Sequence, residues 1–276
     1  MSVIAGRLLE VGVAVSNLDQ ASRHFTHLLR APISAPIEER ESFGLRFTMA
    51  RVGRADFEIM ESIEPSGLVA RFVARQGEGL HHIAFEIDDA QTAMRVLKSR
   101  GVPVLSDQPV RLANLLAFFI HPAYFGGMLV EFVQNLHPWL DGVTYQDDGQ
   151  LPGLEARRIT GITAVVSDVD SVSERLADTL GAGRGERVNS RWFDGPARRC
   201  PIGDIDLTLV PVQADQRPGL RLVSIAVDDL ARSRANLERL GAQVRCSGSS
   251  STRPDALWIE HADFHRVPVE LIPIAT

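Results

Sequence analysis

The chain has 276 residues, a formal net charge of −6 and an isoelectric point near 5.8. The acidic balance argues against a nucleic-acid partner, because a polyanion would be repelled. The sequence has no run of about 18 apolar residues, so we expect no membrane-spanning segment. A composition of 45% hydrophobic and 23% charged residues is that of a globular protein, and the length allows two domains with separate cores.

The N-terminal stretch and the cysteines bear on the compartment. Arg7 and Glu10 interrupt the apolar stretch of residues 1–15, which makes it a poor signal peptide. The two cysteines, Cys200 and Cys246, stand 46 residues apart and fit neither a disulfide framework nor a zinc motif. We therefore expect a cytoplasmic protein with free thiols.

Four segments of the chain repeat one pattern. Each has a short apolar strand, a polar or acidic turn and an amphipathic helix, and in three of the four a glycine follows the helix. The four strands begin at Glu10, His82, Gly161 and Leu222. Intervals of 61 to 79 residues are too long for a solenoid, so each segment is expected to be a half-domain.

The first two segments also predict individual elements. Expected in chain order are strands over Leu8–Val15, near Ile33, over Leu45–Arg51 and over Asp56–Glu61, a short helix over Leu68–Arg75, and a strand over Val102–Leu105. Gly126 and Gly127 predict a tight turn or a bulge before the last strand of the second segment.

Each segment closes on a comparable strand. In each segment we count from the first residue of its first strand to the second residue of its last strand. The four distances are 48, 49, 47 and 48 residues. Near-equal spacing indicates structurally equivalent positions, and these hold Glu10 and Glu58, His82 and Glu131, Gly161 and Thr208, and Leu222 and Glu270. The first two pairs are rich in metal-binding groups and the last two are not.

One histidine with several carboxylates suits a hard or borderline divalent cation: Mn, Mg, Co, Zn or Fe. The alternative is that Glu10, Glu58 and Glu131 are strand carboxylates that face water. If they cluster, a metal or a shared proton must offset their repulsion. Neighbours on a strand point to opposite faces, so His81 is expected to face the helix layer or the rim of the cavity if His82 faces the cavity.

These motifs resemble the vicinal oxygen chelate superfamily, which includes glyoxalase I, methylmalonyl-CoA epimerase, extradiol dioxygenases and bleomycin resistance proteins. The likeness to methylmalonyl-CoA epimerases is greatest over Gly79–Asp89 and His121–Glu131. It implies an α+β fold of four βαβββ modules paired into two domains, each with a curved mixed sheet around a cavity. It also implies a metal held by Glu10, Glu58, His82 and Glu131, although the family usually has histidine where Glu10 stands.

The modules are expected at residues 7–62, 79–134, 158–212 and 219–274. The first domain would span residues 1–134 and the second 158–276. Residues 135–157 would form the linker, because they hold two prolines, three glycines and a polar run.

Two functions follow from the resemblance. One is a metal-dependent isomerase or lyase acting on a carbonyl or carboxylate substrate through an enolate, with an acyl-CoA epimerisation as the example and a small molecule as partner. Glu10, Glu58 or Glu131 would move the proton, with Glu41 as a further candidate base whose alternative is a solvated charge. The other is a non-catalytic binding or resistance protein of the same fold.

Ring cleavage of the extradiol type is disfavoured. In those dioxygenases the iron site lies in the second half of the chain, where this sequence has Gly161, Leu222 and Glu270. The sequence leaves open a homodimer.

Overall fold

Four capped helices mark the repeated modules in the computed structural model. The model describes residues 3, 5–40, 43–112, 115–136, 145–146, 156–247, 255–259 and 264–274. The module helices are α1 (Leu18–Leu29), α3 (Ala90–Ser99), α4 (Val169–Leu180) and α5 (Leu230–Arg239). Each begins after an Asn or Asp whose side chain accepts a hydrogen bond from the backbone N–H three residues on; these residues are Asn17, Asp89, Asp168 and Asp229. The turn that closes each first strand therefore also starts the next helix.

The expected elements are found, with one difference. The first module holds β1 (Leu8–Ala14), β2 (Ile33–Ser34), β3 (Ile37–Glu39), β4 (Leu45–Val52) and β5 (Ala55–Ser62), followed by α2 (Leu68–Gln76). The second holds β6 (Gly79–Glu86), β7 (Val110–Leu112), β8 (Leu115–Ile120), the 3-10 turn η1 (Pro122–Phe125) and β9 (Leu129–Asn135). The strand expected over Val102–Leu105 is wrong: Val104 makes only an isolated bridge to Ile120, because Pro103 has no N–H to donate.

The second half repeats the arrangement. The third module holds β11 (Ala156–Val166), β12 (Glu186–Asn189), β13 (Pro196–Ile202) and β14 (Ile205–Pro211). The fourth holds β15 (Gly219–Val227), β16 (Val244–Ser247), β17 (Ala256–Ile259) and β18 (Val269–Pro273), and β10 (Tyr145–Gln146) lies between the halves of the chain.

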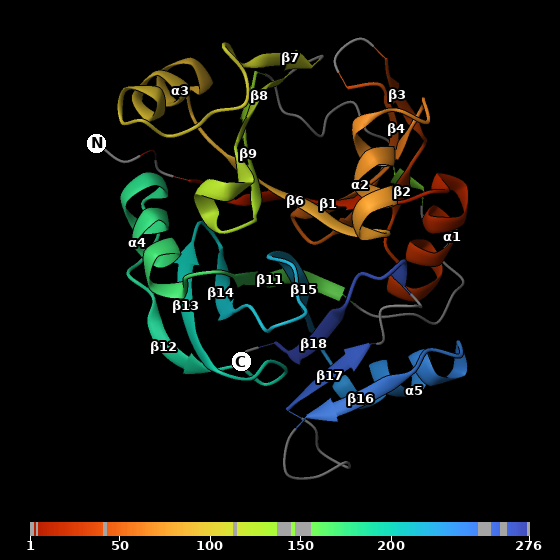
Figure 1. The fold of residues 1–276 in the computed structure, drawn as a ribbon. Coiled ribbons are helices and arrows are strands. Elements are labelled where there is room, and N and C mark those ends of the chain that lie inside the picture. The colour runs from red at the N-terminus through yellow and green to blue at the C-terminus, as the bar shows by residue number, and fades with distance from the viewer. Residues whose placement is uncertain are drawn as a thin grey trace. The chain divides into compact units, whose positions relative to one another are not determined.

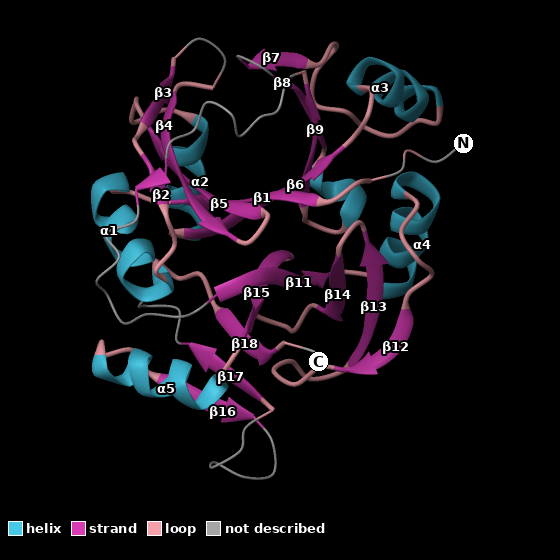
Figure 2. Ribbon diagram, turned by 180° about the vertical axis from the view of Figure 1, so that it is seen from behind, coloured by secondary structure: helices cyan, strands magenta, loops and turns pink. Residues whose placement is uncertain are grey.

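The strands form two mixed sheets. The order is β10-β2-β4-β5-β1-β6-β9-β8-β7 in the ten-stranded sheet, with β3 on β4, and β12-β13-β14-β11-β15-β18-β17-β16 in the eight-stranded sheet. The first two modules thus share one sheet and the last two share the other, which confirms the expected α+β class with paired modules. In Figures 1 and 2, α4 packs on β13 and β14, and α5 packs on β16 to β18.

Contacts divide the chain into two compact units. Residues 1–10, 82–143 and 161–221 form unit 1, and residues 11–81, 144–160 and 222–276 form unit 2. The domain boundaries expected from the sequence stay a prediction, and most of the expected linker lies outside the described residues. Within the described part of the chain, no helix is long and apolar enough to cross a membrane.

Gly126 and Gly127 show why the turn before β9 uses glycine. Their φ angles are +64° and +108°, in the region that other residues rarely adopt. A Cβ on Gly127 would lie 2.5 Å from the Cβ of Pro218. The expected tight turn is confirmed, and it sets the start of the strand that carries Glu131.

Candidate metal centre

The candidate site in unit 1 is built on β6, β9 and β8. β6 and β9 are parallel and pair His82 with Leu129 and Ala84 with Glu131. β8 runs antiparallel to β9 and pairs Phe119 with Glu131. Because side chains alternate along a strand, this register places His82, Glu131 and Phe119 on one face of the sheet.

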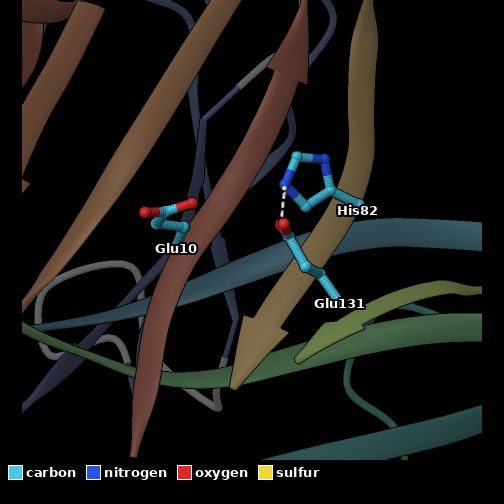
Figure 3. Close-up of side chains that lie close together, drawn as sticks. All are labelled: Glu10, His82 and Glu131. Carbon is cyan, nitrogen blue, oxygen red and sulfur yellow. Dashed lines mark ion pairs between the residues drawn. The ribbon is translucent and has the colours of Figure 1, made fainter. Parts of the chain in front are cut away.

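Three side chains meet there. Glu10 comes from β1, His82 from β6 and Glu131 from β9, and one ligand atom of each lies within 4.8 Å of the others. Figure 3 shows the three together, with the ion-pair contact between His82 Nε2 and Glu131 Oε2 at 3.2 Å. Their exposed fractions are only 5%, 2% and 6% for Glu10, His82 and Glu131.

The surroundings are apolar. The Phe119 ring stands edge-on to the His82 imidazole, with ring centroids 5.7 Å apart. Beside the site, Ala84 and Val133 belong to a buried cluster with Leu9, Leu115 and Ala117. Buried carboxylates in such a medium need a counter-charge, because an apolar environment solvates ions poorly.

The donor set fits a divalent cation. Ligands about 2.1–2.3 Å from one ion and at right angles to each other are separated by about 3.0–3.2 Å, the spacing of the His82 and Glu131 atoms. Two carboxylates and one imidazole also supply the charge and the ligand types that hard and borderline ions prefer. Glu10, His82 and Glu131 are thus the residues that could hold a metal.

Two further predicted site residues remain untested. Glu58 is half-buried on β5 in unit 2, paired with Met49 of β4, and is not part of the three-residue group. Its role as a fourth ligand stays a prediction. Glu41 lies outside the described residues.

The neighbours of His82 follow the sequence argument. His81 faces helix α2, where its ring stands edge-on to Phe72 with centroids 4.7 Å apart. His121 caps η1, and its Nδ1 accepts a hydrogen bond from Ala123 N at 3.3 Å. The alternation of side chains along β6 therefore separates a packing histidine from the site histidine.

The sequence analysis did not identify Phe119, because only the pairing of β8 with β9 brings it to Glu131.

The equivalent positions of the second half carry no such group among the described residues. Leu222 is 2% exposed, and Glu270 is buried opposite Ser224, whose hydroxyl donates to Glu270 Oε2 at 2.6 Å. The Glu270 carboxylate is therefore stabilised by a neutral hydroxyl partner within its own sheet.

Comparisons with known proteins confirm the superfamily resemblance of the first half of the chain. Residues 10–119 match the family model of the Glyoxalase/Bleomycin resistance protein/Dioxygenase superfamily. The chain is 28% identical over 131 residues to the mitochondrial methylmalonyl-CoA epimerase of Bos taurus, a match that covers 47% of this chain and 74% of that protein. It is 29% identical over 132 residues to the ethylmalonyl-CoA/methylmalonyl-CoA epimerase of Cereibacter sphaeroides, covering 47% of this chain and 98% of that protein.

The whole chain has a structural counterpart. A mutant of 4-hydroxymandelate synthase from Streptomyces coelicolor superimposes with a TM-score of 0.70, covering 98% of this chain and 93% of that one. Sequence identity is 15%, so the likeness concerns the fold alone.

Proposed function

We propose that this chain, whose first half carries a domain of the glyoxalase/bleomycin resistance/dioxygenase superfamily, is a metal-dependent isomerase or lyase, most simply an epimerase. The observation that carries the proposal is the buried group of Glu10, His82 and Glu131, with ligand atoms within 4.8 Å of one another. Methylmalonyl-CoA epimerase homologues over the same half of the chain support an isomerase.

The residues have distinct tasks in this proposal. Glu10, His82 and Glu131 hold a divalent cation. When bound, such an ion would polarise a substrate carbonyl and stabilise the negative charge that develops on its oxygen. Either Glu10 or Glu131 takes a proton from the carbon beside that carbonyl and returns one. Phe119 and Ala84 give this face of the sheet an apolar lining, and a water-poor site would strengthen each charge interaction inside it.

The substrate class comes from the relatives. Their names specify methylmalonyl-CoA and ethylmalonyl-CoA, which are acyl-CoA thioesters with an acidic carbon next to a carbonyl. We infer an acyl-CoA or a related carboxylic substrate for this chain.

Metal analysis combined with an exchange assay tests the proposal. The purified full chain is stripped, reloaded with Mg, Mn, Co or Zn and incubated with methylmalonyl-CoA and other acyl-CoA thioesters in D₂O. We expect metal-dependent deuterium uptake at the carbon beside the carbonyl. Glu10→Gln and Glu131→Gln are assayed at a metal concentration that saturates each variant, and the variant that then loses exchange identifies the proton carrier. A metal-loaded protein that exchanges none of these substrates refutes the acyl-CoA reading.

A binding protein without turnover is the second candidate. It is favoured by the second half, where Leu222 is apolar and Glu270 is bonded to Ser224. This candidate predicts acyl-CoA binding that shifts the melting temperature while deuterium uptake is absent. The first candidate predicts both the shift in melting temperature and the deuterium uptake.

A further inference from the structure

A second group of ionisable side chains lies in unit 2. His24 is on α1, Glu78 directly precedes β6, and His265 lies in the turn before β18. His265 Nε2 is 3.0 Å from His24 Nδ1, and His265 Nδ1 is 2.7 Å from Glu78 Oε2. Residues separated by 241 positions in the sequence thus form one continuous chain of polar contacts.

Glu78 is held firmly at both oxygens. Ser16 N donates to Glu78 Oε1 at 2.8 Å, the Ser16 hydroxyl donates to the same atom, and His265 holds Oε2. Both oxygens of Glu78 are thus engaged, which fixes the carboxylate against His265.

The backbone around Glu78 leaves room for Arg266. Gly77 and Gly79 flank the carboxylate with φ angles of +82° and +144°. A Cβ on Gly77 would lie within 3.0 Å of the guanidinium of Arg266, and a Cβ on Gly79 would lie 3.3 Å from the Arg266 carbonyl oxygen. Two glycines thus let the Arg266 turn approach Glu78.

His265 occupies an unusual backbone position. Its φ is +50° and that of Arg266 is +63°, a region that residues other than glycine seldom adopt. The adjacent Phe264 is fully buried and meets Phe25 of α1 edge-on at 5.7 Å. Consecutive residues of the turn therefore contact consecutive residues of α1, because His24 and His265 have ring centroids 4.9 Å apart. Packing holds the imidazole where the backbone alone would not place it.

Hydrogen-bond chemistry fixes the ring orientation. The Glu78 carboxylate acts as the acceptor, so His265 Nδ1 carries the hydrogen of this contact. His265 Nε2 then has the lone pair, and in the metal-free protein His24 Nδ1 donates a hydrogen bond to it at 3.0 Å; a metal ion would take the place of that hydrogen. A carboxylate that holds one imidazole nitrogen while the other presents its lone pair is the usual arrangement behind a histidine metal ligand.

We propose that His24 and His265 form a second metal site, which takes a borderline divalent ion of the Zn²⁺, Ni²⁺ or Cu²⁺ type. His24 Nδ1 and His265 Nε2 are the ligands, and Glu78 orients His265. Their 3.0 Å separation is that of neighbouring nitrogens about 2.1 Å from one ion. Two imidazoles select these ions over Mg²⁺, unlike the carboxylate-rich group of unit 1. Water or a small ligand fills the other coordination positions.

Copper EPR and zinc titration of the full chain test the site. All measurements use protein that carries Glu10→Gln and Glu131→Gln, so that metal bound by the Glu10, His82 and Glu131 group does not contribute to the signal. The superhyperfine structure of bound Cu²⁺ should show two nitrogens. His24→Gln and His265→Gln should each lower the count and weaken zinc binding by more than 100-fold. Glu78→Gln should weaken it by about 10- to 100-fold, as expected for an orienting partner.

His27→Gln is the matched control, since His27 is also half-buried on α1. It should leave the nitrogen count and the zinc affinity unchanged. A wild-type nitrogen count of one, or zinc binding that survives His24→Gln, would show that the two rings share only a proton. The nitrogen count is measured on proteins with both histidines, so it decides the question even if a histidine variant does not fold.

Discussion

Glu131→Gln tests whether the carboxylate pair of unit 1 exists for a cation. The carboxylates of Glu10 and Glu131 have oxygens within 4.8 Å, and both side chains are buried. With an effective dielectric constant of about 20, two unit charges at that distance repel by about 3.5 kcal/mol. At pH 8 an ordinary imidazole is neutral and offsets little of this repulsion.

The variant should therefore be more stable than wild type when both are stripped of metal. Glutamine keeps the shape of the side chain and removes one charge. Because solvent weakens part of the repulsion, we expect a gain of about 1–2 kcal/mol, or roughly 2–8 °C in melting temperature.

Added metal should reverse this order of stability and make wild type the more stable protein. An ion at 100 times its dissociation constant stabilises wild type by about 2.7 kcal/mol. If losing one ligand weakens binding by about 100-fold, the same concentration stabilises the variant by only about 0.4 kcal/mol. Thermal melting at pH 8, with EDTA and with Mn²⁺ or Mg²⁺, measures both effects. A stripped variant that melts below wild type, or an unchanged metal shift, refutes the reasoning.

Three further outcomes are expected. Glu10→His should move the metal preference toward Zn, Co or Ni while metal binding persists. His82→Ala should severely weaken the binding of Mg, Mn, Co and Zn, since it removes the nitrogen ligand of the group. Competitive metal titration measures the affinities of both variants. Against the effect of burial, hydrogen bonds from Ser16 and His265 lower the pKa of Glu78 from its ordinary value of 4.5, so the ionised carboxylate stabilises the fold above pH 4.5. This contribution is lost as the pH falls through the folded-state pKa. In acid titration, Glu78→Gln should therefore lose less stability than wild type below pH 4.5. Phe25→Ala should cost about 3–5 kcal/mol in urea denaturation, because the fully buried ring packs against Phe57 and Phe264; a cost below 1 kcal/mol would contradict this packing.

The sequence alone determined the repeated elements. Short apolar strands, polar or acidic turns and helical periodicity are local signals, so a first strand followed by a helix was predicted for each of the four modules, and α1, α3, α4 and α5 are found there. Equal spacing marked Glu10, Glu58, His82 and Glu131 as equivalent positions, and the family resemblance implied that they hold one metal; three of the four have ligand atoms within 4.8 Å of one another.

Only the tertiary structure decided which groups actually meet. Glu58 has the same spacing argument as Glu131, but the three-residue group does not include it, and its role as a fourth ligand stays a prediction. The His24–His265 pair had no sequence signal. It depends on a contact across 241 residues and on a positive φ at His265, and both arise from packing of the folded chain rather than from any local preference.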